Sequence, residues 1–180
     1  MAYAADGFQA NVGYIIWPIF IFIVLNGAYL KVGLYSALIV LGMIVLRYTV
    51  GELVDRLSKD KIIKTGSWLY ALGWLLKAVV ASGWQIFLVG VYHNFTQILY
   101  KTPLDALTYE IAADEEHYID EFTILKEMAL HIGKISMVIL SLLVLCWLEV
   151  KWVFVVSAMV AMVIGLINKQ EFYLSRRKLD

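Results

Sequence analysis

The composition of the chain is that of a membrane protein. Its 180 residues are 62% hydrophobic and its mean hydropathy is +0.77, whereas a soluble globular domain is closer to half apolar. The 15 basic and 15 acidic side chains cancel to a net charge of +0, so we expect no nucleic-acid partner. The single cysteine, Cys146, excludes an intrachain disulfide and a cysteine metal cage.

Six apolar segments predict six membrane-spanning helices, because a span needs roughly 20 mostly apolar residues. The stretch 65–100 is too long for one span, and Ser82-Gly83-Trp84 divides it, since glycine ends helices and tryptophan favours the membrane interface. The expected fold is therefore an all-α integral membrane protein with a single transmembrane domain over residues 1–180. The predicted spans are 10–29, 33–54, 65–82, 84–101, 125–148 and 152–169.

The distribution of lysine and arginine predicts the orientation of these helices. One side carries ten of them, while the other carries only Lys31 and Lys151. We therefore expect both termini in the cytoplasm of a bacterial or archaeal cell with the spans in its plasma membrane. The ten are Arg56, Lys59, Lys61, Lys64, Lys101, Lys126, Lys169, Arg176, Arg177 and Lys178.

The inner loop expected over residues 102–122 is the longest connection in this topology. Thr102 is a plausible N-cap residue, and Pro103 follows it at the first helical position. The sequence therefore predicts a separate, short amphipathic helix that starts here and lies at the cytoplasmic membrane surface.

Several predicted spans contain ionisable side chains, and each costs about 2.5–3.5 kcal/mol at the bilayer centre. Glu127, His131 and Lys134 lie at i, i+4 and i+7 and so share one helix face. His93, Gln97 and Tyr100 repeat this spacing in the fourth span. Such faces need a polar surface opposite them, so we expect these residues to form a substrate or proton pathway, with Glu127 as the proton-titratable group.

Other polar residues extend the candidate set, and structural interpretations of some of them stay open. Arg47 lies in the second span, Asn11 and Tyr14 lie at the start of the first, and a kink is expected at Pro18. Long side chains near span ends can also extend their charged groups to the membrane surface, and Lys77 can do so in the third span.

The segment that follows the second predicted span carries a motif. It reads Gly51-Glu52-Leu53-Val54-Asp55-Arg56-Leu57-Ser58-Lys59-Asp60-Lys61-Ile62. It resembles the signature loop G-x-L-a-D-R-x-G-R/K-R/K-x-L of the major facilitator superfamily, which joins the second and third helices of a six-helix half. Ser58 replaces the central glycine, and Asp60 replaces a basic residue. The matching residues are Gly51, Leu53, Asp55, Arg56, Lys59 and Ile62.

This resemblance implies one six-helix half of a secondary transporter that normally has twelve helices. It implies alternating access and two inverted three-helix repeats, here about 10–82 and 84–169, with the cavity shared between two halves. The expected partners are the lipid bilayer, a second copy of the chain or another six-helix half, and a polar small-molecule substrate, with proton coupling as one option for its transport. The first and fourth spans would line the cavity, through Asn11, Tyr14, His93 and Gln97. The cytoplasmic gate would be held by Gly51, Leu53, Asp55, Arg56 and Lys59.

Other function classes stay open beside the transporter. The chain can be a non-transporting six-helix membrane scaffold, or an isolated half of a twelve-helix transporter. An intramembrane enzyme has less support, because the sequence contains no H-E-x-x-H or G-x-S-x-G motif, although His93, His131 and Glu127 could share a metal. We therefore expect no enzymatic activity, no catalytic residue, no metal and no cofactor.

Overall fold

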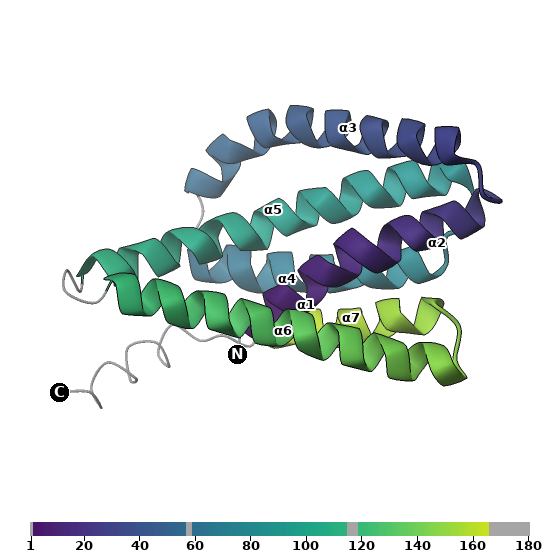
Figure 1. The fold of residues 1–180 in the computed structure, drawn as a ribbon. Helices are drawn as coiled ribbons and strands as arrows, with labels where there is room; N and C mark the ends of the chain where they lie inside the picture. The colour runs from purple at the N-terminus through teal and green to yellow at the C-terminus, as the bar shows by residue number, and fades with distance from the viewer. Residues whose placement is uncertain (1, 57–58, 115–118, 166–180) are drawn as a thin grey trace.

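The computed structural model is all-helical, as predicted, and it describes residues 2–56, 59–114 and 119–165 (Figure 1). The segments α1, η1 (a π-helical segment) and α2 follow one another without a break and are called the first helix below. Together with the later helices they make six helical rods within the described residues. The elements are α1 (Ala2–Asn11), η1 (Val12–Ile16), α2 (Trp17–Val24), α3 (Tyr29–Arg56), α4 (Lys59–Ala78), α5 (Gly83–Asp114), α6 (Ile119–Trp147) and α7 (Lys151–Gly165).

Three helices in the described residues are long and apolar enough to cross a membrane, which indicates a membrane protein. They cover Tyr3–Val24, Tyr29–Arg47 and Asp120–Trp147, while the apolar helix Lys151–Gly165 is shorter. The helices α4 and α5 have lower hydropathy, because α4 begins with several charged residues and α5 carries polar residues along the interior of the bundle.

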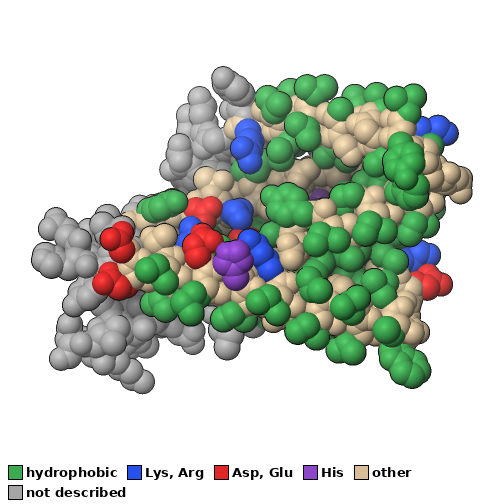
Figure 2. All heavy atoms as spheres, in the orientation of Figure 1, with side chains coloured by type: hydrophobic (Ala, Val, Ile, Leu, Met, Phe, Trp, Pro, Cys, Tyr) green, Lys and Arg blue, Asp and Glu red, His purple; other side chains and the backbone are tan. Residues whose placement is uncertain are grey.

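The helices run alternately up and down the bundle, and their pairing gives it two sides (Figure 1). The first helix packs on α6 and α7, and α5 packs on α3 and α4. Contacts between α4 and α7 join these two groups. The short connections 25–28, 79–82 and 148–150 lie together at one end (Figure 1). Hydrophobic side chains are spread over much of the face drawn in Figure 2, where most charged side chains gather left of the centre and a few lie at the right-hand edge.

Two turn sequences fix where the connections 25–28 and 79–82 begin and end. The first helix ends at Val24, before the predicted residue 29, because Asn26 (φ 52°) and Gly27 (φ 78°) adopt the left-handed conformation that ends helices. At the predicted break, Ser82 and Gln85 form a capping box. The Gln85 Oε1 accepts hydrogen bonds from the backbone N–H groups of Ala81 and Ser82, at 2.8 and 3.1 Å.

The predicted loop 102–122 and its separate surface helix are wrong. The helix α5 continues through Pro103 to Asp114, and α6 begins at Ile119. Pro103 removes one backbone hydrogen bond, but Pro103 and Leu104 are both buried, which favours a continuous helix. The extension is also tied to α6, since the Lys126 Nζ lies 3.7 Å from an Asp105 carboxylate oxygen.

Glycines allow two helix pairs to approach closely. A Cβ atom added to Gly7 would overlap the backbone of Leu130 on α6, and one added to Gly133 would overlap the backbone of Ala4 on α1. The α3–α5 pair repeats this reciprocal arrangement with Gly42 and Gly90, whose added Cβ atoms would meet side chains of the opposite helix. Small residues of this kind drive helix association in membranes, because lipid removes the hydrophobic difference between helix and surroundings.

We expect Gly133→Ala to separate the first helix from α6 and to destabilise the protein by about 1–3 kcal/mol, the usual cost of overpacking. The midpoint of thermal unfolding in detergent, followed by tryptophan fluorescence, measures this. Gly33→Ala is the matched control, since nothing lies within 4 Å of a Cβ atom at Gly33. Equal midpoints for the two variants would contradict the close α1–α6 contact.

Candidate functional site

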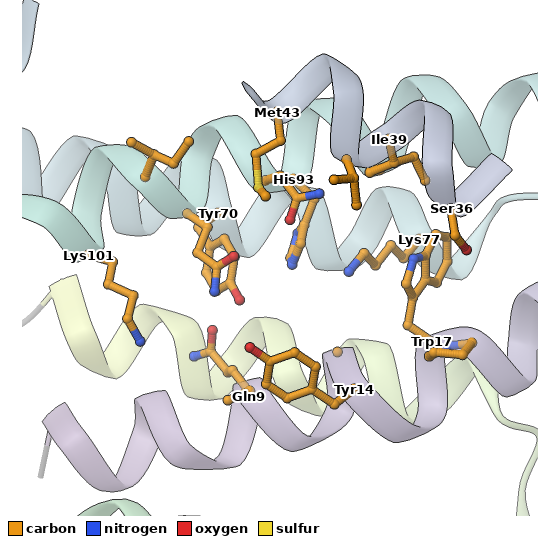
Figure 3. A pocket seen from close by; sticks show the side chains of 18 of the residues that line it. Gln9, Tyr14, Trp17, Ser36, Ile39, Met43, Tyr70, Lys77, His93 and Lys101 are labelled. Carbon is orange, nitrogen blue, oxygen red and sulfur yellow. The ribbon is translucent and has the colours of Figure 1, made fainter. Parts of the chain in front are cut away.

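A cavity of about 840 Å³ lies between the first helix, α3, α4 and α5 (Figure 3). Its volume falls within the range of small-molecule sites, roughly 300–1,000 Å³. Apolar side chains such as Trp17, Ile39 and Met43 form part of the wall. The polar part of the wall consists of Gln9, Tyr14, Ser36, Arg47, Tyr70, Lys77, His93, Asn94, Gln97, Lys101, Thr102 and Asp105.

The π-helical segment η1 shapes the first-helix side of this cavity. Pro18 has no backbone N–H, and the N–H of Trp17 bonds to the carbonyl of Val12, one residue further back than in an α-helix. The kink expected at Pro18 therefore takes the form of a π-helical turn just before the proline. Tyr14 and Trp17, in and next to this turn, both line the cavity.

Trp74 on α4 connects the polar groups at the base of the cavity. Its indole is fully buried, and its Nε1–H donates a hydrogen bond to the Gln9 Oε1 at 3.2 Å. The His93 ring lies edge-on to it, with ring centroids 4.4 Å apart, and His93 also stacks on Tyr70 at 4.3 Å. One indole thus joins side chains from the first helix, α4 and α5.

Lys77 is buried beside the same indole, with only 3% of its surface exposed. Its Nζ lies 4.1 Å from the ring centroid of Trp74 and 4.7 Å from that of Trp17, distances typical of cation–π interactions. Among the residues that the structure describes, it makes no hydrogen bond and no ion pair. Its side chain therefore points into the bundle rather than to the membrane surface (Figure 3).

Two further buried polar atoms on residues of the cavity wall have no hydrogen-bond partner in the described part of the chain. They are the Gln9 Nε2 and the His93 Nδ1, and both side chains line the cavity. The orientation of the Gln9 amide follows from its neighbour, because an indole N–H can only donate and must face the amide oxygen. The unpartnered Gln9 atom is therefore an NH₂ donor.

The buried carboxylate of Asp6 joins the first helix to α5 at the end of the cavity where Lys101 lies. Asp6, 4% exposed, lies 2.7 Å from the Lys101 Nζ and accepts a hydrogen bond of 2.9 Å from the Tyr100 hydroxyl. It thereby links the first helix to α5. Asp105, the acidic side chain on the cavity wall, pairs with Lys126. Among the described side chains, the ammonium of Lys77 and the guanidinium of Arg47 lack an ion pair, so the cavity is electropositive.

The predicted pathway residues divide between the cavity and the outside of the bundle. Tyr14, Arg47, His93 and Gln97 all line the cavity. Asn11 instead donates a hydrogen bond of 3.5 Å from its Nδ2 to the carbonyl of Lys134, whose side chain is half-buried. Glu127 and His131 are exposed and line a shallow depression formed by α6 alone.

The predicted gate motif covers the last turns of α3 and the first turn of α4. The side chains of its matching residues Gly51, Leu53, Asp55, Arg56 and Lys59 lie outside the described part. Within the described residues there is no group of three or more His, Cys, Asp and Glu side chains that could hold a metal. His93 lies inside the bundle while His131 lies outside it, so these two histidines do not meet.

Sequence reasoning did not select several residues that the structure brings into the cavity or its ends. Asp6 and Gln9 precede the predicted start of the first span at residue 10, but α1 begins at Ala2. Lys77 and Trp74 are spaced i, i+3 on α4, which places an ammonium and an indole on one helix face. That pairing was the available signal for a buried cation.

No protein-family model, curated protein or solved structure matches the chain. The cavity and the packing around it are therefore the basis for the function proposed below.

We expect Asp6→Asn to weaken the link between the first helix and α5 and to destabilise the protein by about 1–3 kcal/mol, because it leaves the buried Tyr100 hydroxyl and the partly buried Lys101 ammonium poorly satisfied. Chemical denaturation in detergent measures this, and a double-mutant cycle with Lys101→Met isolates the pair. Glu149→Gln is the control, since the Lys151–Glu149 pair is largely exposed and is expected to contribute little. Additive effects of Asp6→Asn and Lys101→Met would contradict the bridge.

Proposed function

We propose that the chain is one half of a secondary transporter, similar to a six-helix half of the major facilitator superfamily, that moves a polar small molecule by alternating access. The observation that carries this proposal is the cavity of about 840 Å³ with its polar and charged wall inside an apolar helix bundle. Polar and ionisable groups are costly within membranes and mark substrate or ion pathways there. The first helix and α5, the fourth rod, provide opposite walls, as expected for inverted-repeat transporters.

The pairing of helices supports two inverted three-helix repeats. If the first helix is exchanged with α5, α3 with α6 and α4 with α7, the contact between the first helix and α6 becomes the contact between α5 and α3. The same operation turns the α4–α5 pair into the α7–first helix pair and leaves the α4–α7 pair unchanged. Because the rods alternate in direction, repeats related in this way have opposite orientations (Figure 1). The reciprocal glycines of the α1–α6 and α3–α5 pairs follow the same relation.

In this proposal all six rods span a bacterial or archaeal plasma membrane, with both termini in the cytoplasm. The rods α4 and α5 are enclosed by neighbours and line the cavity, so they need less apolar surface than a helix that faces lipid on all sides. Proton coupling would require a titratable group that faces the cavity. His93 meets this requirement, whereas Glu127 faces outwards.

The outer face of α6 supports a second half as the partner. Glu127 and His131 are exposed on a helix that is otherwise apolar enough to cross the membrane. Facing hydrocarbon, these side chains would be unfavourable by several kcal/mol, so a second copy of the chain or another six-helix half is expected to cover them. The same face would serve assembly if the chain were a non-transporting scaffold.

Alternating access predicts that one residue midway along the cavity can be reached from both sides of the membrane. In a Cys146→Ser background, we expect Asn94→Cys in proteoliposomes to react with a membrane-impermeant thiol reagent from either side. Asn94 lines the cavity, whereas Leu142 is 61% exposed on the outside of α6, so Leu142→Cys is the unreactive control. Reaction of Asn94→Cys from one side only would contradict alternating access.

A homodimer of halves predicts a protein mass near twice 20.5 kDa in native nanodiscs. We expect the double variant Glu127→Ala/His131→Ala to shift this population toward monomer, because it removes the polar groups at the proposed interface. Glu149→Ala, a change at the exposed turn before α7, is expected to leave the mass unchanged. A monomeric wild-type protein would contradict the homodimer and would mean that the second half is a different chain.

A further inference from the structure

We infer that the cavity is an anion site, in which Lys77 and Gln9 bind the carboxylate of a small organic acid while its apolar body lies against Trp17, Ile39 and Met43. This inference rests on the proposed function, since it names the chemical class of the substrate. The acid would enter beside Tyr14, which lines the cavity and is 80% exposed.

The charge of the ligand follows from Lys77. The residue is 3% exposed, and an ammonium buried in this way is strongly unfavourable without a counter-ion. The indoles of Trp17 and Trp74 replace only part of its hydration. Within the described residues the carboxylate on the cavity wall, Asp105, pairs with Lys126, and Asp6 pairs with the wall residue Lys101. A ligand that carries its own negative charge would complete the site.

The shape of the charged group follows from Gln9. Its NH₂ has no partner in the described residues, and both Gln9 and Lys77 contact the indole of Trp74, one at the N–H edge and the other over the ring face. The two donors are thus held by one rigid ring. A carboxylate has two oxygens and can accept from an ammonium and an amide together, and such charge-assisted bonds are the stronger kind.

The organic body of the ligand follows from the remaining wall. The cavity is much larger than an inorganic anion needs, and apolar side chains of the first helix and α3 make up much of its lining (Figure 3). Arg47 adds a second positive charge at the wall and has no ion pair among the residues described, which would attract anions to the entrance. A cationic substrate would meet no unpaired carboxylate among the described residues of the wall.

The test is calorimetric titration of the full chain in nanodiscs with acetate, benzoate and phenylacetate, and with the neutral amide of each acid. We expect the aromatic acids to bind and their amides not to bind. We expect Lys77→Met to weaken benzoate binding by at least about tenfold, the loss typical of a charge-assisted contact. Lys31→Met, which removes an exposed lysine at the start of α3, is the matched control and should bind as the wild type does.

Stability without ligand separates a binding lysine from a structural one. Because Lys77→Met removes an unpaired buried charge, we expect a higher unfolding midpoint in the absence of acid. We expect Gln9→Glu to raise the midpoint as well and to abolish benzoate binding, since its carboxylate keeps an acceptor for Trp74 and supplies the missing anion. A Lys77→Met variant that fails to fold or unfolds earlier than the wild type would overturn the site.

The remaining outcomes distinguish the anion site from the transporter proposal. Failure of all three acids to bind, or binding that Lys77→Met leaves intact, overturns the anion site even if uptake of some other solute is found. If chloride competes for the site as strongly as benzoate does, the assignment of an organic acid as the ligand is overturned. Benzoate binding that depends on Lys77, without uptake into proteoliposomes, supports the anion site and removes the transporter.

Discussion

The burial of the Lys77 ammonium inside an apolar bundle is the constraint on which the rest of the site depends. A charge in this position is tolerable only if aromatic faces, water or an anion replace its hydration. The structure meets part of this requirement with Trp74 and Trp17, which come from α4 and from the first helix. Trp74 in turn holds Gln9 and contacts His93, so one charge organises side chains from three rods.

The bundle can hold an open cavity because its tight contacts lie elsewhere. Glycines bring the first helix against α6 and α5 against α3, and α4 packs along α7. The first helix and α5 themselves are joined near one end by Asp6, which binds Lys101 and Tyr100. A single ion-pair cluster closes this end of the cavity instead of a packed helix interface. Separating the two helices there would need little free energy, because few apolar contacts would be lost.

The helical fold and most helix positions followed from the sequence, because long apolar stretches and the Asn26-Gly27 and Ser82–Gln85 turn signals act locally. The extension of α5 beyond Pro103 could not be predicted from the sequence, because a proline that starts a helix and a proline inside one have the same local pattern. The burial of Leu104, a tertiary contact, favours the continuous helix. Helical spacing placed His93 and Gln97 on one helix face, and both line the cavity. The spacing does not determine whether a helix face points into the bundle or out of it. The stripe of Glu127 and His131 shares one face, as predicted, yet that face lies outside the bundle.

The chain therefore has two kinds of polar surface, one enclosed around Lys77 and one exposed on α6. The residues around Lys77 are enclosed, are joined by hydrogen bonds and ring contacts, and leave donor groups that point into a cavity, which is the arrangement of a binding site. Glu127 and His131 lie on a single helix with no cavity wall opposite them, which is the arrangement of a surface that a partner covers. In the transporter proposal, a six-helix unit with both surfaces has its ligand chemistry within itself, so a second half would serve mainly to complete the walls and to move against them.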